Sequence, residues 1–190
     1  INILFTIGGD GTQRGGNALF EEATRRGHAL SVVGVPKTVD NDVAFVTRSF
    51  GFLTAVEEAA KVLDRAHTEA RSVGNGVALV KLMGRHAGFI AVGATVASQD
   101  VNFTLIPEVP FALDGPRGLL AAVAARVRER GHALVVVAEG AVPIDGSMTV
   151  QSTDVDAFGH VRLGGISNVL GAEIEDRTGF ETRVTVLGHV

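Results

Sequence analysis

Cysteine, tryptophan and tyrosine are all absent from the 190 residues of this chain. The lack of cysteine excludes disulfide bonds, zinc sites with thiolate ligands and a thiol nucleophile. Long apolar stretches are also missing, because runs such as 133–138 are far shorter than the roughly 20 residues that a membrane-spanning helix needs. No signal sequence opens the chain, so the cytoplasm is the expected location.

Clusters of basic residues are equally scarce. The longest basic run is Arg25-Arg26, the formal net charge is -4 and the isoelectric point is about 5.9. Nucleic-acid binding draws its affinity from clustered lysine and arginine that neutralise phosphates. We therefore expect neither a nucleic-acid partner nor a membrane partner.

The residues that are present suit a folded α/β protein. With 46% hydrophobic and 20% charged residues, the chain can bury a core that makes one domain or parts of two. Continuous apolar, β-branched runs are typical of strands buried on both faces, and they alternate with stretches of helical spacing. This alternation predicts βα units and mainly parallel sheets. The expected strands lie near 1–7, 31–36, 77–83, 101–106, 133–138 and 182–188, and the expected helices cover 13–26, 52–71, 86–98, 117–130 and 162–178.

Three features concern the organisation of the chain. Residues 140–161 are rich in turn formers and predict an exposed excursion or a short hairpin. The helix near 52–71 is the expected join between two lobes, with the boundary near residue 50. Because the chain opens and closes inside strand-like runs, we expect it to be an internal part of a longer protein.

The first motif with chemical potential is Gly8-Gly9-Asp10-Gly11-Thr12, between an expected strand and an expected helix. Glycines let backbone N–H groups approach phosphate oxygens, and the start of a helix favours negative charge. Asp10 could hold the Mg²⁺ that neutralises such phosphates. The alternative is a tight turn in which Asp10 only caps the helix, and this motif alone does not decide between them.

The second motif is Pro36-Lys37-Thr38-Val39-Asp40-Asn41-Asp42, again just past a strand. Ends of parallel strands share one edge of a sheet, so the two motifs can converge. One carboxylate can accept the proton of an attacking hydroxyl, the other can orient it, and Lys37 can neutralise a moving phosphoryl group. A hydrophilic turn rich in aspartate hydrogen bonds is the alternative.

Four further motifs follow along the chain: Phe50-Gly51-Phe52 with Thr54-Ala55, Met83-Gly84-Arg85, Ala138-Glu139-Gly140, and Glu181-Thr182-Arg183 with Leu187-Gly188-His189. In order and spacing, these and the two motifs above, Gly8–Thr12 and Pro36–Asp42, together resemble the 6-phosphofructokinase family. The resemblance runs from residue 1 to 190 and is weakest over 141–161. Residues 8–15 and 80–85 are most similar to the ATP-using enzymes of plants and some protists, and 164–190 to bacterial members. The resemblance implies a three-layer phosphofructokinase-like fold, in which 1–50 belong to the phosphoryl-donor lobe and 51–190 to the sugar-phosphate lobe.

The resemblance implies Mg²⁺-dependent transfer of a phosphoryl group from ATP to the 1-hydroxyl of fructose 6-phosphate in glycolysis. Asp40 matches the general base and Asp42 its support, with Lys37 and Gly11 completing the catalytic set. Arg183 matches an arginine that reaches the 6-phosphate from a neighbouring subunit, in a homodimer or homotetramer. The donor site would comprise Gly8, Gly9, Asp10 (beside Mg²⁺), Gly11 and Thr12, and the sugar site Thr38, Asp40, Met83, Gly84, Arg85, Glu139, Arg183 and His189.

Physical chemistry supports these assignments. Phosphates favour guanidinium groups such as those of Arg85 and Arg183, and a carboxylate such as Glu139 suits sugar hydroxyls. Glu139 ends an apolar strand, where an unpaired carboxylate is costly to bury, so it requires a polar partner. The other histidines have no metal-ligand spacing and are interpreted as structural: His28, His67, His86, His132 and His160.

Departures from the family leave alternatives open. Gly76 or Val77 stands where many bacterial members have a second phosphate-binding arginine, and the family's N-terminal glycine-rich donor loop lies outside the chain. Gly11 favours ATP, whereas Lys37 is typical of diphosphate users, so a diphosphate-dependent phosphofructokinase is the first alternative. A non-catalytic sugar-phosphate-binding regulatory subunit and a lipid or dinucleotide kinase with the same glycine motif are the others.

Overall fold

The computed structural model describes residues 1–144, 151–155, 161–163 and 165–188, and for 151–155 and 161–163 it gives the backbone course alone. The chain forms two compact units, Ile1–Ala55 and Val56–Val190. They divide inside α2 (Phe52–Ser72), five residues beyond the boundary expected near residue 50. Each unit is described by itself below.

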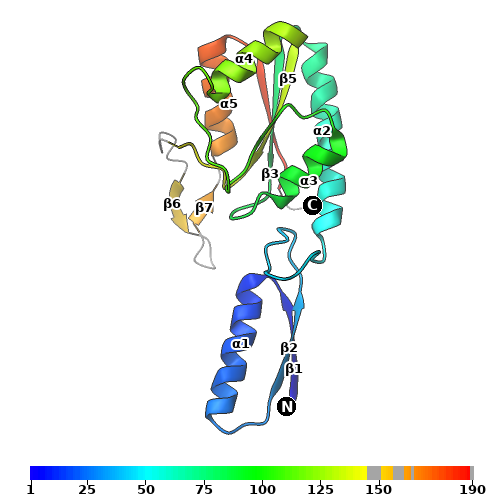
Figure 1. The fold of residues 1–190 in the computed structure, drawn as a ribbon, viewed down its shortest axis with the longest axis vertical. Coiled ribbons are helices and arrows are strands. Elements are labelled where there is room, and N and C mark those ends of the chain that lie inside the picture. Colours follow the sequence, from blue (N-terminus) through cyan, green and yellow to red (C-terminus); the bar gives the residue numbers. More distant parts are fainter. Residues whose placement is uncertain (145–150, 156–160, 164, 189–190) are drawn as a thin grey trace. The chain divides into compact units, whose positions relative to one another are not determined.

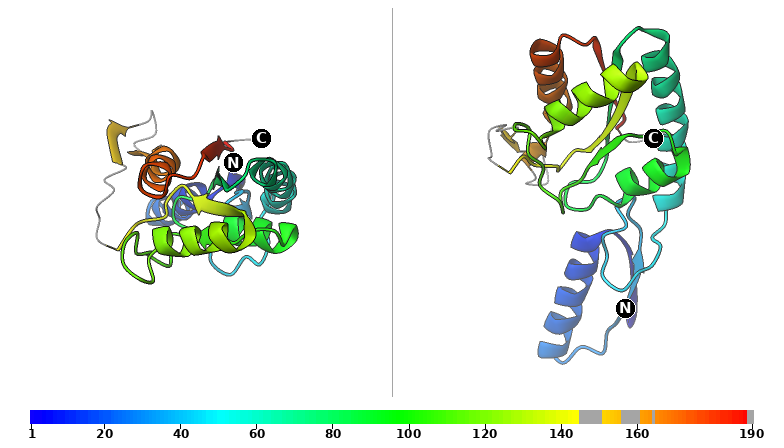
Figure 2. Two further views of the ribbon diagram at one scale, coloured as in Figure 1. Left: turned by 90° about the horizontal axis from the view of Figure 1, so that it is seen from above. Right: turned by 45° about the horizontal axis from the view of Figure 1, so that its top comes forward.

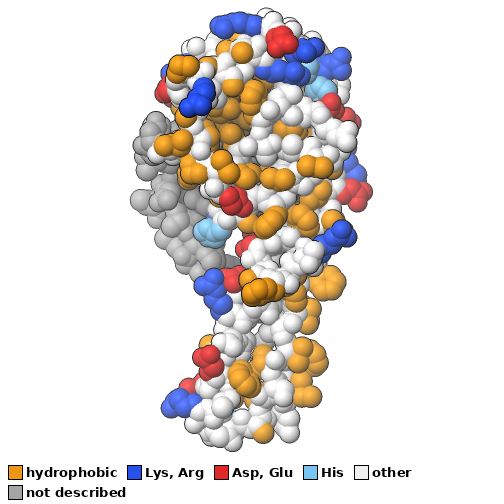
Figure 3. Space-filling view, in the orientation of Figure 1, with side chains coloured by type: hydrophobic (Ala, Val, Ile, Leu, Met, Phe, Trp, Pro, Cys, Tyr) orange, Lys and Arg blue, Asp and Glu red, His pale blue; other side chains and the backbone are white. Residues whose placement is uncertain are grey.

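The first unit is a βαβ arrangement. Strand β1 (Ile3–Gly8), helix α1 (Asp10–Arg25) and strand β2 (Ser31–Pro36) follow one another, and the strands pair in parallel from Ile3 opposite Ser31 to Gly8 opposite Pro36. The prediction that these strands are buried on both faces is wrong for the chain as described. One helix covers one face, and hydrophobic side chains reach the surface of this unit beside its strands (Figure 3): Ile3, Phe5, Ile7 and Val33.

The second unit is a parallel sheet covered by helices (Figure 1). Its strand order is β4-β5-β3-β8, and each neighbouring pair is parallel. The α/β fold class with mainly parallel sheets is thus confirmed. The elements are β3 (Gly76–Leu82), α3 (Phe89–Ser98), β4 (Phe103–Leu105), α4 (Leu119–Arg130), β5 (His132–Ala138), α5 (Ile166–Thr178) and β8 (Thr182–Val186).

The core of the second unit follows from strand alternation. Successive residues of a strand point to opposite faces, so a continuous apolar strand feeds two hydrophobic layers. All of β3 and nearly all of β5 is buried, which confirms the prediction for these two strands. Helices α4 and α5 pack on one face and α2 and α3 cover the other, giving three layers (Figure 2). The first layer includes Val77, Leu79, Val123, Val127, Val135, Val137, Leu170 and Ile174.

The excursion after β5 contains an antiparallel pair, β6 (Gln151–Val155) and β7 (Val161–Leu163). This is the short hairpin that the turn formers suggested. Its second strand uses residues expected to open a helix at 162, and α5 begins at Ile166 instead. Among the described residues, no helix combines the length and apolarity needed to cross a membrane.

Candidate active site

The ends of β1 and β2 place the two motifs of the first unit side by side. The N–H of Lys37 donates to the carbonyl oxygen of Gly8 at 2.8 Å, which extends the ladder past β2. The side-chain amide of Gln13 donates to the carbonyls of both Gly8 and Val35 at 3.0 Å. A Cβ atom on Gly9 would lie 3.5 Å from the Cβ of Thr38. The glycine motif and the start of the aspartate loop are therefore in direct contact.

Helix α1 begins inside the glycine motif. Gly9 is its N-cap and Asp10 its first residue, so the interpretation of Asp10 as a side-chain cap is wrong. The helix begins three residues before the expected position, and its first turn comprises Asp10, Gly11 and Thr12. N–H groups of a first turn have no intrahelical acceptor and carry a partial positive charge. The motif thus presents backbone donors suited to an anion.

Gly11 lies in open space. No atom outside its local helix lies within 4 Å of where its Cβ would be, and its φ is outside the left-handed region. Neither packing nor backbone conformation therefore requires glycine here, although glycine in a helix is about 1 kcal/mol less favourable than alanine. The missing side chain leaves room beside the first turn of α1, where a ligand can approach the backbone.

Asp10 has a chemistry compatible with Mg²⁺. Its half-exposed carboxylate forms an ion pair with Arg14 one turn further along α1. Mg²⁺ is often held by one or two carboxylates, water and the phosphates of its substrate rather than by a full protein cage. One carboxylate beside anion-binding N–H groups fits that pattern. Among the described residues, no group of three or more His, Cys, Asp or Glu is placed to hold a metal by itself.

The loop that carries Asp40 and Asp42 is braced by Ser49. The Ser49 hydroxyl donates to the carbonyl of Thr38 at 2.6 Å, and its N–H donates to Oδ1 of Asn41 at 2.8 Å. Ser49 is only 6% exposed. Asn41 adopts a φ of 56°, a conformation that asparagine tolerates better than most residues.

The consequence is a fixed turn around the two aspartates. The N–H of half-buried Asp40 donates to Oγ1 of Thr38 at 3.2 Å, while Asp42 and Lys37 are exposed. Both ends of the turn are tied to Ser49, which the sequence did not single out. A polar residue eight positions beyond Asn41 carries no local signal for this role.

In the second unit, the candidate residues follow the carboxyl ends of β3 and β5. Glu139 N–H donates to the carbonyl of Leu82, and Gly140 N–H to that of Gly84, both at 3.0 Å. Gly84 has a φ of 129°, and a Cβ there would lie 2.4 Å from the carbonyl oxygen of Ala87. Glycine is thus required at Gly84, and this turn sets Met83 and Arg85 beside Glu139.

Glu139 has the polar partner that its position requires. Lys81 Nζ lies 3.2 Å from Glu139 Oε2, and Arg85 Nε lies 3.9 Å from Oε1. Lys81 is buried in β3 and was not among the expected site residues. The signal that could have found it is a single charge inside an otherwise apolar strand.

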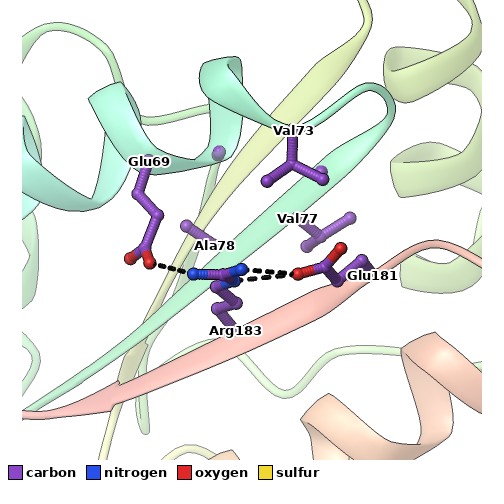
Figure 4. A pocket seen from close by; sticks show the side chains of 8 residues that line it. Glu69, Val73, Val77, Ala78, Glu181 and Arg183 are labelled. Carbon is purple, nitrogen blue, oxygen red and sulfur yellow. Dashed lines mark hydrogen bonds and ion pairs between the residues drawn. The ribbon is translucent and has the colours of Figure 1, made fainter.

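Arg183 lies near the amino ends of the strands, at the end of the sheet opposite to Arg85 and Glu139. On the edge strand β8 it stands opposite Ala78, close to the start of β3, whereas Arg85 and Glu139 follow strand ends. It lines a pocket with Val73, Val77 and Ala78 (Figure 4) and pairs with Glu181 and Glu69. The hydrogen bonds that the Arg183 guanidinium donates, first to Glu181 and then to Glu69, raise its pKa. The structure does not bring Arg183 together with the chain's own Glu139.

Among the histidines that the structure describes, His67 and His132 form a close pair. His189, expected in the sugar site, and His160 lie outside the described residues. His67 Nε2 lies 3.1 Å from His132 Nε2, and His67 Nδ1 lies 3.1 Å from Asp100 Oδ2. Burial lowers the pKa of His132. This pair stands where β5 begins, away from the carboxyl ends of the strands.

Comparison with known proteins identifies the family. A sequence profile described as phosphofructokinase matches residues 1–190. ATP-dependent 6-phosphofructokinase 7 of Arabidopsis thaliana is 48% identical over 176 residues, 93% of this chain and 36% of that protein. ATP-dependent 6-phosphofructokinase of Amycolatopsis methanolica is 44% identical over 192 residues, 99% of this chain and 40% of that protein. The chain thus spans well under half the length of these relatives.

Solved structures agree with this result. The pyrophosphate-dependent phosphofructokinase from Marinobacter aquaeolei superposes with a TM-score of 0.76 at 28% identity, covering 98% of this chain and 44% of that one. Profile, relatives and structure all match nearly the whole chain, and the fold is the three-layer α/β arrangement described above. The chain belongs to the phosphofructokinase family.

Proposed function

We propose that the full-length protein is an ATP-dependent 6-phosphofructokinase of the cytoplasm, which converts fructose 6-phosphate to fructose 1,6-bisphosphate in glycolysis. The observation that carries this proposal is the contact between the glycine motif and the aspartate loop. Lys37 N–H binds the carbonyl of Gly8, and Thr38 packs at Gly9. A phosphoryl donor held at the start of α1 would then lie near the loop that bears Asp40.

Asp40 is the proposed general base. It accepts the proton of the sugar's 1-hydroxyl as that oxygen attacks the γ-phosphorus of ATP, and the bond from this phosphorus to the β,γ-bridging oxygen breaks, so that ADP leaves. Asp42 orients the group. The turn fixed by Ser49 and Thr38 holds Asp40 in place before substrate binds. Such pre-positioning lowers the barrier because little reorganisation remains at the moment of reaction.

Charge on the donor is stabilised by the first unit. Gly8, Gly9, Gly11 and Thr12 offer backbone donors to phosphate oxygens, and Asp10 is the residue that would hold Mg²⁺. When bound, Mg²⁺ neutralises charge on the transferring phosphates. The exposed Lys37 adds a further positive charge.

The second unit is proposed to bind the sugar phosphate. Glu139 accepts hydrogen bonds from sugar hydroxyls, and Arg85 donates to a phosphate group. Met83 and Gly84 form the turn between β3 and Arg85. Thr38 of the first unit and His189 complete the proposed set.

Arg183 is proposed to serve the site of a neighbouring subunit in a homodimer or homotetramer. Its place opposite Ala78 keeps it away from its own chain's Glu139 and supports this assignment. The flanking carboxylates of Glu69 and Glu181 keep the exposed guanidinium ordered.

ATP is favoured over diphosphate by two observations. The relatives at 43–52% identity are named ATP-dependent, and the space beside Gly11 is open. Diphosphate is the second candidate donor, because Lys37 is present and a structural relative is named pyrophosphate-dependent.

The test is product formation by the full-length protein with ATP and with diphosphate, each with saturating fructose 6-phosphate and Mg²⁺. We expect fructose 1,6-bisphosphate with ATP. Asp40→Ala should bind fructose 6-phosphate while turnover falls by orders of magnitude. Turnover with diphosphate alone would reverse the choice of donor, and near-normal turnover by the Asp40 variant would refute the assigned base.

A further inference from the structure

Lys81 is a charged residue near the carboxyl end of β3, an interior strand of the main sheet. Strand β3 lies between β5 and β8, all of its residues are buried, and Lys81 is 8% exposed. Lysine is almost never buried without a partner, because removing an ammonium group from water is costly. Its partner is Glu139, with Nζ 3.2 Å from Oε2. This contact joins two neighbouring strands at their carboxyl ends.

The second cation near Glu139 is held differently. Arg85 Nε lies 3.9 Å from Oε1, which is beyond hydrogen-bond distance. The Arg85 side chain is 27% exposed, against 10% for that of Lys81. Lys81 is therefore committed to the carboxylate, whereas Arg85 retains access to solvent and to a ligand.

The choice of lysine at this position has a chemical consequence. The chain has fourteen arginines and three lysines, Lys37, Lys61 and Lys81. An arginine fork holds both oxygens of a carboxylate, whereas an ammonium group is a compact point charge. The contact from Lys81 is to Oε2, which leaves Oε1 able to accept a bond from another donor.

We propose that Lys81 is a positioning residue. Its ammonium group supplies the positive charge that pairs with Glu139, and this pairing leaves the guanidinium of Arg85 available to an anionic group of the substrate. The inference rests on the proposed function, which gives Glu139 and Arg85 their ligands. Without Lys81, the nearest cation to Glu139 is Arg85. An approach of about 1 Å would bring its Nε into hydrogen-bond range, and the phosphate would lose its partner.

A double-mutant cycle in the full-length enzyme tests this inference. Lys81→Met should raise KM for fructose 6-phosphate about tenfold or more, with a much smaller change in kcat, since a charge-assisted contact is lost. Lys81→Arg keeps the counter-charge but can occupy both oxygens of Glu139, so it should restore only part of the affinity. In the Glu139→Gln background Arg85 has no carboxylate to approach, so adding Lys81→Met should change KM by less than about threefold. Lys61→Met, an exposed lysine of α2, is the matched control and should leave both constants unchanged.

The outcomes distinguish a failure of the role proposed for Lys81 from a failure of the proposed function. Equal increases in KM in both backgrounds would overturn the role of Lys81, because a purely structural lysine acts independently of Glu139. If Lys81→Met alone fails to fold, the comparison of Glu139→Gln with the double variant decides in the same way. Absence of product from the unsubstituted enzyme would instead overturn the proposed function and the ligand assigned to Arg85.

Discussion

Replacing Gly140 with alanine perturbs the contact that holds Glu139 beside Arg85. A Cβ on Gly140 would lie 1.8 Å from the carbonyl oxygen of Arg85 and 2.6 Å from its carbonyl carbon. Real Cβ atoms keep at least 3.0 Å from such atoms, so the two segments must separate by at least 1.2 Å. The neighbouring hydrogen bond, from Gly140 N–H to Gly84, is only 3.0 Å long and would be strained or broken.

Two effects should result, one on stability and one on catalysis. Overpacking of a well-ordered segment destabilises by about 1–3 kcal/mol, which lowers Tm by about 2–12 °C for a cooperative unit of 150–250 residues. A misplacement of about 1 Å in a substrate-positioning group reduces kcat/KM by about 100-fold. Calorimetry gives the first quantity and the proposed phosphofructokinase assay gives the second.

Gly74→Ala is the control for this experiment. Gly74 is exposed, no atom lies within 4 Å of its Cβ position, and its φ is outside the left-handed region. That variant should retain both Tm and kcat/KM. If Gly140→Ala also retains both, the close contact between the ends of β3 and β5 is not a constraint on the site, and the reasoning fails.

Three further predictions concern the donor, the core and the response to pH. Gly11→Asp should change Tm by no more than about 2 °C, because no described atom outside the local helix lies within 4 Å of the position of the added Cβ. It should lower kcat/KM for ATP more than kcat/KM for diphosphate, and equal losses for both donors would contradict this prediction. Leu134→Ala, at a fully buried site, should cost about 2–5 kcal/mol in urea denaturation, and a loss well below about 1 kcal/mol would contradict this expectation. Burial lowers the pKa of His132 from 6.5, so the unfolded chain takes up this proton first and the free energy of unfolding should fall as pH drops below about 6.5. The His132→Gln variant should flatten that slope, and an unchanged slope would refute the assignment.

Much of the architecture could be predicted because local sequence patterns determine it. The continuous apolar runs 77–83 and 133–138 identified β3 and β5 almost to the residue, since a strand buried on both faces needs an apolar residue at every position. The same pattern misjudged β1, whose residues Ile3, Phe5 and Ile7 are exposed in this chain. A continuous apolar run indicates that a strand can be buried on both faces, but it does not indicate which elements cover those faces.

The candidate site shows the same limit. The position of Glu139 after an apolar strand predicted a polar partner, and the structure supplies Lys81. The identity of that partner depends on the pairing of Lys81 with Val137 across two strands that are more than fifty residues apart. Ser49 is comparable, because its bonds to Thr38 and Asn41 close a loop whose path no local pattern describes.

The parallel sheet also constrains how many chains a complete site requires. The four strands β4, β5, β3 and β8 of the second unit's main sheet run the same way, so Arg85 and Glu139 share the carboxyl edge while Arg183 stands opposite Ala78. From Ala78 to Leu82 the strand already advances about 13 Å, and the side chain of Arg183 is engaged by Glu69 and Glu181. A phosphate bound at the carboxyl edge is therefore out of reach of the same chain's Arg183. If this arginine contributes to catalysis, it does so for a neighbouring subunit, and an Arg183→Ala subunit mixed with an Asp40→Ala subunit should recover active sites that neither variant forms alone.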